Sequence, residues 1–192
     1  MTKNRIEAFS DGVIAIIITI MVLELKVPHD ANPAALLKLA PVFLSYVLSF
    51  IFIGIYWNNH HHTFHAIKHI SAGVLWANLH FLFWLSLIPF VTGWMGENNF
   101  ARWPVFAYGA VMLAAAFASN ILLRTLIASN GADSPIAKAV GEDWKGKSSL
   151  AIYALGLLLV FVHPLAAIVC YLAVAIMWFI PDRRIERVLP HE

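Results

Sequence analysis

The stretch of sequence that decides the fold lies near the N-terminus, at residues 5–23, and reads RIEAFSDGVIAIIITIMVL. Its second half is almost wholly apolar, and a helix needs roughly 20 apolar residues to cross a membrane core. We therefore predict a first membrane-spanning helix at residues 8–27. Glu7 and Asp11 stand beside the basic N-terminal residues, and no small-x-small cleavage site follows Leu23. We expect a retained helix and not a cleaved secretory signal.

The rest of the 192-residue chain is also strongly apolar. Hydrophobic residues make up 60% of it and charged residues 12%, and the mean hydropathy is +0.75, whereas soluble domains are about half apolar and a quarter charged. This excess predicts an all-α integral membrane protein in contact with the lipid bilayer. The net charge of +2 is small and the basic residues are scattered, which excludes nucleic acid as a partner. The single Cys170 cannot form an intrachain disulfide.

Five more apolar stretches predict membrane-spanning helices at residues 41–57, 72–91, 103–123, 149–163 and 165–180. The last two form a run too long for one span, and His163-Pro164 interrupts it because proline breaks the helical hydrogen-bond ladder. A tight helical hairpin is therefore expected there. The polar stretch from Ser129 to Ser148 predicts a loop. We expect one domain of six transmembrane helices over residues 1–192.

Positive charges predict the orientation of these helices. If both termini are cytoplasmic, ten basic residues fall on the inner side: Lys3, Arg5, Lys68, Arg124, Lys138, Lys145, Lys147, Arg183, Arg184 and Arg187. Three fall on the outer side: Lys26, Lys38 and Arg102. This asymmetry predicts a multi-pass protein of the cell membrane with both termini in the cytoplasm.

The first helix has two distinct faces. At about 100° per residue, Ile16, Ile20 and Leu23 share one apolar stripe with Thr19 on its flank. Asp11 points roughly 140° away from Ile16 and should face neighbouring helices, because a charge near a membrane is costly unless protein or water surrounds it. By itself the stripe fits contact with lipid or with other helices as well as with a pore.

The string Arg5-x-x-x-Phe9-Ser10-Asp11 strongly resembles the signature of the transmembrane protein 175 family of potassium channels. The resemblance covers the first three predicted helices and includes further matching residues: Tyr56, Trp57, His60, Phe64, Asn78, Leu79 and the run Leu87-Ile88-Pro89-Phe90. The later helices agree only in hydropathy and length. One six-helix repeat resembles the short prokaryotic form of the family, which implies a homotetramer.

The resemblance implies that first helices line a central pore for potassium and other monovalent cations. The family's pore-facing apolar positions fall on Ile16, Ile20 and Leu23, and its hydroxyl position falls on Thr19. Rings of apolar side chains could close such a pore by dewetting. The expected function is a potassium-preferring monovalent cation channel with a hydrophobic constriction.

A second set of residues would support the pore helix. On the resemblance, the set is Arg5, Phe9, Ser10, Asp11, Trp57, His60 and Asn78. We expect His60 to pair with Asp11 or with a neighbouring indole. Helix capping and interfacial snorkelling are the alternative roles of Arg5, Ser10 and Asp11.

Histidines cluster after the second predicted span, and this pattern raises a different function. On a helix, His61, His65 and His69 would share one face, and such spacing can hold a transition metal. A membrane metalloenzyme of the hydroxylase or desaturase type is therefore an alternative, although such enzymes need several separated histidine boxes. We favour an interfacial polar cluster without metal or other cofactor. A proton-coupled transporter is a third possibility, and the lack of a charged residue in the middle of any predicted span speaks against it.

Overall fold

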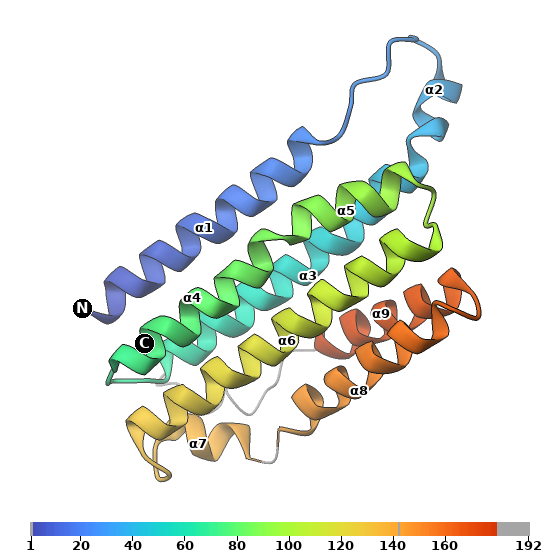
Figure 1. The fold of residues 1–192 in the computed structure, drawn as a ribbon. Coiled ribbons are helices and arrows are strands. Elements are labelled where there is room, and N and C mark those ends of the chain that lie inside the picture. The colour runs from blue at the N-terminus through green and yellow to red at the C-terminus, as the bar shows by residue number, and fades with distance from the viewer. Residues whose placement is uncertain (1, 142, 180–192) are drawn as a thin grey trace.

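A computed structural model of the chain describes residues 2–141 and 143–179. These residues form an all-helical bundle (Figure 1) with the helices α1 Lys3–Leu23, α2 Pro33–Lys38, α3 Ala40–His65, α4 Ala72–Ser86, α5 Ile88–Glu97, α6 Arg102–Asn130, α7 Pro135–Val140, α8 Trp144–Leu159 and α9 Pro164–Phe179. The predicted all-α fold is confirmed.

The long helices run side by side, with α1 along one edge of the bundle (Figure 1). Helix α1 packs on α3, α4 and α5, whereas α6 packs on α4, α5, α8 and α9. The short helices α2 and α7 lie at opposite ends of the bundle. An edge position leaves one face of α1 without a helix packed on it from the described part of the chain.

Four helical segments of the described residues are long and apolar enough to cross a membrane: Lys3–Leu23, Ala40–His65, Ala72–Glu97 and Arg102–Asn130. They correspond to the first four predicted spans, but their ends differ. The first begins earlier than residue 8 and ends before residue 27, and the second and fourth extend well beyond residues 57 and 123. Helices often extend past the apolar core because polar residues continue the hydrogen-bond ladder into the interface. The α8 and α9 helices have 16 residues each, so two further spans stay a prediction.

The third span is a pair of helices and not one continuous helix. Helix α4 ends at Ser86 and α5 begins at Ile88, with Leu87 between them. Pro89 lies in the first turn of α5, where its missing N–H costs least but interrupts the ladder arriving from α4. The pair extends to Glu97, six residues past the predicted end at 91.

The predicted hairpin near the C-terminus is present, with α8 ending at Leu159 and Pro164 opening α9. The prediction of a loop from Ser129 to Ser148 was wrong in part, because α7 and the first turns of α8 lie within it. Ser134 caps α7 and Asp143 caps α8 through their side chains, and such caps begin helices that apolar periodicity alone does not reveal. Ile180, Arg183, Arg184, Arg187 and His191 lie outside the described residues.

The packing of one tyrosine ring on two glycines holds α6, α8 and α9 together. The ring of Tyr171 in α9 is fully buried and lies against Gly109 of α6 and Gly156 of α8. A Cβ atom at either glycine would collide with this ring. Small residues at such crossings let membrane helices pack tightly, so Tyr171 fixes how the α8–α9 hairpin sits on α6.

Candidate functional site

The inner face of α1 is anchored in the helical bundle. Ile6, Ser10, Ile14, Ile17 and Met21 are all buried, each no more than 3% exposed. Their spacing of three or four residues places them on one side of the helix, which packs on α3, α4 and α5. Ile14 thus lies on the face opposite the predicted stripe.

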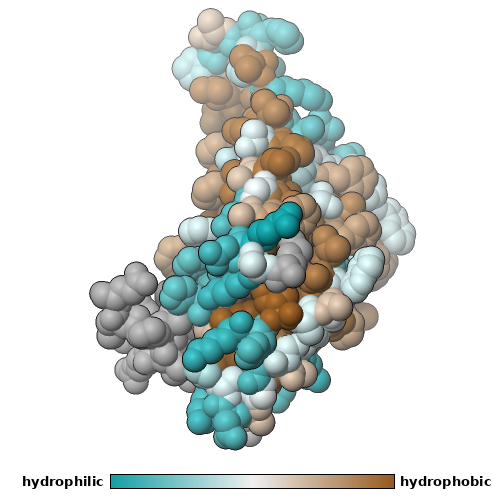
Figure 2. All heavy atoms as spheres, turned by 90° about the vertical axis from the view of Figure 1, so that its left-hand side faces the viewer, coloured by the Kyte–Doolittle hydropathy of each residue, from teal (hydrophilic) through white to brown (hydrophobic). Residues whose placement is uncertain are grey.

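The outer face of α1 carries the predicted pore stripe. Ile16 is 59% exposed, Ile20 43% and Leu23 75%, and Thr19 is exposed as well. On the side of the molecule where α1 lies, apolar side chains fill the middle of the surface and hydrophilic ones gather toward its ends (Figure 2). The stripe is therefore available to a lipid, a neighbouring subunit or a pore.

Thr19 is held in a defined orientation on this outer face. Its hydroxyl donates a hydrogen bond of 2.9 Å to the carbonyl of Ala15 one turn earlier. This bond occupies the single hydroxyl proton, so any further partner meets the oxygen as an acceptor. A cation is such a partner.

The polar residues on the inner face form a buried hydrogen-bond relay across three helices. The Asn78 amide of α4 donates to the Ser10 hydroxyl of α1 at 3.0 Å. The Ser10 hydroxyl donates in turn to the carbonyl of Ile6 at 2.8 Å. The carbonyl oxygen of Asn78 lies 2.9 Å from Nε2 of His60 in α3, and as an acceptor it requires that this nitrogen carry the proton. All three side chains are at most 5% exposed.

A second tie joins α1 to α3 at the protein surface. The indole N–H of Trp57 donates a hydrogen bond of 2.9 Å to the carboxylate of Asp11. Asp11 thus meets a neighbouring helix, as predicted. The predicted partner of His60 was wrong, because His60 bonds Asn78 and the indole bonds Asp11. The rotation of a helix decides which of two nearby polar groups a histidine contacts, and local sequence does not determine that rotation.

Two members of the signature string take no part in these ties. Phe9 is half exposed, and Arg5 is exposed with no side-chain hydrogen bond or ion pair among the described residues. The structure therefore brings together Ser10, Asn78 and His60, and separately Trp57 and Asp11, but leaves Arg5 and Phe9 on the surface.

The other histidines of the predicted cluster lie at the end of α3 and just after it. His61 stacks between Trp57 and His65, with ring centroids 5.9 and 6.1 Å apart. Helix α3 ends at His65, so the prediction that His69 shares this helical face was wrong. The backbone N–H of His69 instead bonds the side chain of Asn130. Within residues 2–141 and 143–179, no three His, Cys, Asp or Glu side chains form a group that could hold a metal ion.

The sequence analysis did not predict an ion pair that lies at the C-terminal end of α1. Lys26, just after α1, forms an ion pair with Glu97 at the end of α5. The Glu97 carboxylate raises the pKa of the Lys26 ammonium. The available signal was that Lys26 and Glu97 carry opposite charges and lie near the ends of two predicted spans that finish on the same side of the membrane.

Comparisons with known proteins agree with this arrangement. A family model described as the endosomal/lysosomal potassium channel TMEM175 matches residues 5–89. A protein named as a potassium channel in Chryseobacterium sp. (strain P1-3) is 50% identical over 189 residues, which cover 98% of both chains. One so named in Streptomyces collinus is 34% identical over 128 residues, 62% of each chain.

The fold is similar to that of a solved channel. The crystal structure of a lysosomal potassium-selective channel TMEM175 homolog from Chamaesiphon minutus superposes with a TM-score of 0.83 at 28% identity, covering 94% of this chain and 97% of that one. The family match includes the signature string on α1, Trp57 and His60 on α3, and Asn78 on α4. With half of its residues identical to a potassium channel over nearly its whole length, this chain belongs to the TMEM175 family of channels.

Proposed function

We propose that this chain is a potassium-preferring monovalent cation channel, assembled as a homotetramer around a central pore lined by α1. The relatives named above as potassium channels support the transported ion. The observation that carries the proposal is the contrast between the two faces of α1. One face is buried in its own subunit, while Ile16, Thr19 and Leu23 on the other are exposed.

The apolar side chains of α1 would form the constriction. Ile16 and Leu23 are about 10 Å apart along the helix axis, so four copies of each would make two rings. A narrow apolar ring excludes water and closes a pore to ions, and a small displacement of the helices rehydrates it. Between the rings, Thr19 would offer hydroxyl oxygens to a partly dehydrated cation. Ile20 lies on the same stripe and would line the pore between them.

The buried relay would set the rotation of α1 about its own axis. Ser10, Asn78 and His60 satisfy one another's hydrogen bonds only in one register of α1 against α3 and α4. A buried polar group without a partner costs free energy, so other rotations are disfavoured. The fixed rotation is what would aim Ile16 and Leu23 at the pore.

The competing functions differ from this one in testable ways. Membership of a channel family sets aside the histidine-cluster metalloenzyme. A proton-coupled transporter would need a coupled proton flux for each turnover, whereas a channel passes ions down their own gradient. The chain is a multi-pass membrane protein. Six spans, a cell-membrane location and cytoplasmic termini complete the proposed topology.

Cation flux into liposomes that contain only the purified protein tests the function. A potassium gradient should drive cation flux without a pH gradient. When flux is measured separately for potassium, sodium, caesium and protons, potassium should pass faster than sodium. Protein-free liposomes and liposomes with a heat-denatured sample are the controls. Cation flux that requires a coupled flow of protons would indicate a transporter, and no flux from intact oligomers would overturn the proposal.

A further inference from the structure

The exposed stripe of α1 is followed at once by an acidic residue. Glu24 comes directly after Leu23, the last residue of α1, and its backbone stays in the right-handed helical region with φ −72° and ψ −13°. The helical spacing therefore still applies, and four positions place Glu24 on the same side of the helix as Ile20. Both side chains are exposed, and both line an open groove between the end of α1 and the α4–α5 pair. A carboxylate thus lies at the end of the face that is proposed to line the pore.

Two more charged residues lie at this end of α1. Lys26 forms an ion pair with Glu97 at the end of α5, and Glu97 lines the same groove as Glu24. The pKa of Lys26 is raised, chiefly by the hydrogen bond and the charge of Glu97 and also by the charge of Glu24. The lysine is thus held by α5, and the three ionised side chains together carry one net negative charge.

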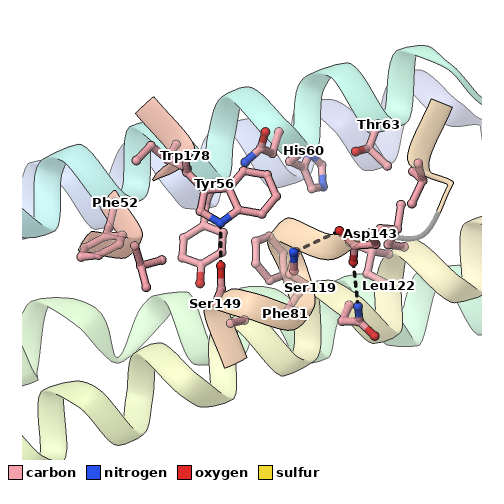
Figure 3. Close-up of a pocket in the computed structure, with 18 of the residues that line it drawn as sticks. Phe52, Tyr56, His60, Thr63, Phe81, Ser119, Leu122, Asp143, Ser149 and Trp178 are labelled. Carbon is pink, nitrogen blue, oxygen red and sulfur yellow. Dashed lines mark hydrogen bonds between the residues drawn. The ribbon is translucent and has the colours of Figure 1, made fainter. Parts of the chain in front are cut away.

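The cavity inside the bundle belongs to a different part of the molecule. It is lined by residues of α3, α4 and α6 to α9 and of the turn before α8, and of the described residues around it none belongs to α1. Asp143 lies at one end of this cavity (Figure 3), where its carboxylate accepts hydrogen bonds of 3.1 Å from the backbone N–H of Gly146 and from the side chain of Asn120. This carboxylate is engaged inside the bundle, whereas Glu24 and Glu97 are the acidic residues among those described around the groove beside α1.

We propose that Glu24 attracts cations to one mouth of the pore and that Glu97 keeps Lys26 from neutralising it. This inference rests on the proposed channel, in which four copies of α1 bring four Glu24 carboxylates to the mouth just beyond the Leu23 side chains. Rings of acidic side chains favour cations in channels, and a mouth lined by one sign of charge raises the local concentration of the ion that enters. Without Glu97, the Lys26 ammonium would be released to pair with Glu24, two positions earlier.

The attraction should depend on ionic strength, because salt screens exposed charges. The screening length is about 30 Å at roughly 0.01 M salt and about 3 Å at roughly 1 M. Exposed carboxylates around a mouth therefore act on an arriving cation mainly in dilute salt. A side chain that shaped the constriction instead would change conduction at every salt concentration, so ionic strength separates the two roles.

Potassium currents through the purified protein in planar bilayers test the role of Glu24. Glu24→Gln should lower the current at least about twofold at roughly 0.01 M potassium and leave it unchanged at roughly 1 M, whereas Glu24→Asp should retain the wild-type current at both. Asp133→Asn should have no effect and is the matched control, because Asp133 is an exposed acidic residue just before α7, at the opposite end of the bundle. An equal loss of current at both salt concentrations, or no loss at either, would overturn the proposal.

Substitutions in the ion pair test the role of Glu97 in dilute salt. Glu97→Gln should lower the current, because the released Lys26 then pairs with Glu24, and Lys26→Gln should raise it. The double variant lacks both charges and should return to the wild-type current, since Glu24 is left as it was. If the ion pair acted only by fastening α1 to α5, the double variant would conduct like Glu97→Gln, and that result would overturn the role of Glu97.

Charge can also be added at this position after the protein has folded. Glu24→Cys in a Cys170→Ala background removes the carboxylate, and a thiol reagent that attaches a sulfonate should restore the current in dilute salt. A reagent of similar size that attaches a quaternary ammonium should lower the current further. Equal effects of the two reagents would show that bulk and not charge acts at the mouth, and would overturn the proposal.

Failure of this inference and failure of the proposed function give different results. A wild-type protein that conducts potassium, together with a Glu24→Gln variant that conducts equally well in dilute salt, would overturn the role of Glu24 and leave the channel standing. A folded wild-type oligomer that conducts nothing at any salt concentration would overturn the channel itself, and this inference with it.

Discussion

The side-chain amide of Asn78 donates a hydrogen bond of 3.0 Å to the hydroxyl of Ser10, 68 positions earlier in the chain. Both side chains are buried, and the other end of the Asn78 amide meets His60. A single side chain thus connects α1, α3 and α4 at the depth of the signature string. The first prediction concerns this connection.

Replacing Asn78 with Ala should destabilise the subunit. The change leaves Ser10 and His60 without this partner in a buried position, and each such loss costs about 2 kcal/mol. Thermal unfolding in detergent should therefore show a clearly lower midpoint. The exposed Asn4 on α1 provides the control, since Asn4→Ala should leave the midpoint unchanged. Equal midpoints for the two variants would show that the relay contributes no stability.

Making the outer face of α1 polar should open the pore. Ile16→Asn and Leu23→Asn should hydrate the constriction and raise basal cation flux at least several-fold, because water then occupies the apolar rings. Liposome flux at equal amounts of oligomer measures the effect.

Two further substitutions separate a pore from a lipid-facing surface. Ile14 is 2% exposed on the inner face of α1, and Ile14→Asn should lower stability without raising flux. Val169 is exposed on α9, and Val169→Asn should leave basal flux unchanged. That result would show that a polar side chain on an exposed face does not by itself open the pore. Unchanged flux in folded Ile16→Asn and Leu23→Asn oligomers would mean that α1 does not line the conduction path.

Replacing Thr19 should change the selectivity among cations more than the rate of flux. Thr19→Val removes the hydroxyl oxygen at constant shape, so the preference for potassium over sodium should fall, whereas Thr19→Ser should retain it. Reversal potentials under bi-ionic conditions give the permeability ratio. A ratio that falls equally in the serine variant would point to packing and not to the hydroxyl.

The tie between Trp57 and Asp11 should be measurable as a coupling energy. Trp57→Phe and Asp11→Ala each remove one partner of the 2.9 Å hydrogen bond, and the double variant should lose less than the sum of the two by about 1 kcal/mol. Chemical unfolding of the four proteins completes the cycle. Simple additivity would show that the bond is broken in solution.

The topology should become visible by labelling cysteines from each side of the membrane in a Cys170→Ala background. Cysteines at Thr2, Asp133 and His191 should react from the cytoplasmic side, and one at Ala31 from the opposite side. Reaction of His191→Cys from the outer side would mean that the chain crosses the membrane an odd number of times. In that case α8 and α9 could not both be membrane-spanning helices.

Local sequence was sufficient to predict the long apolar helical segments and the two faces of the first one. Apolar runs of bilayer length predicted four spans that the structure contains, and the 3.6-residue period separated the exposed Ile16 and Leu23 from the buried Ile14. The reason is that helix formation and periodicity depend on residues a few positions apart. The break between α4 and α5 was missed although Pro89 was its signal.

Only the tertiary structure decided which polar side chains meet. Asp11 and Trp57 are 46 positions apart, and Ser10 and Asn78 are 68 apart, so their pairing depends on how α1, α3 and α4 are rotated against one another. Packing of the whole bundle sets those rotations. It also placed His69 beyond the end of α3 and against Asn130 of α6, since this feature arises from a contact between distant segments that no local pattern encodes.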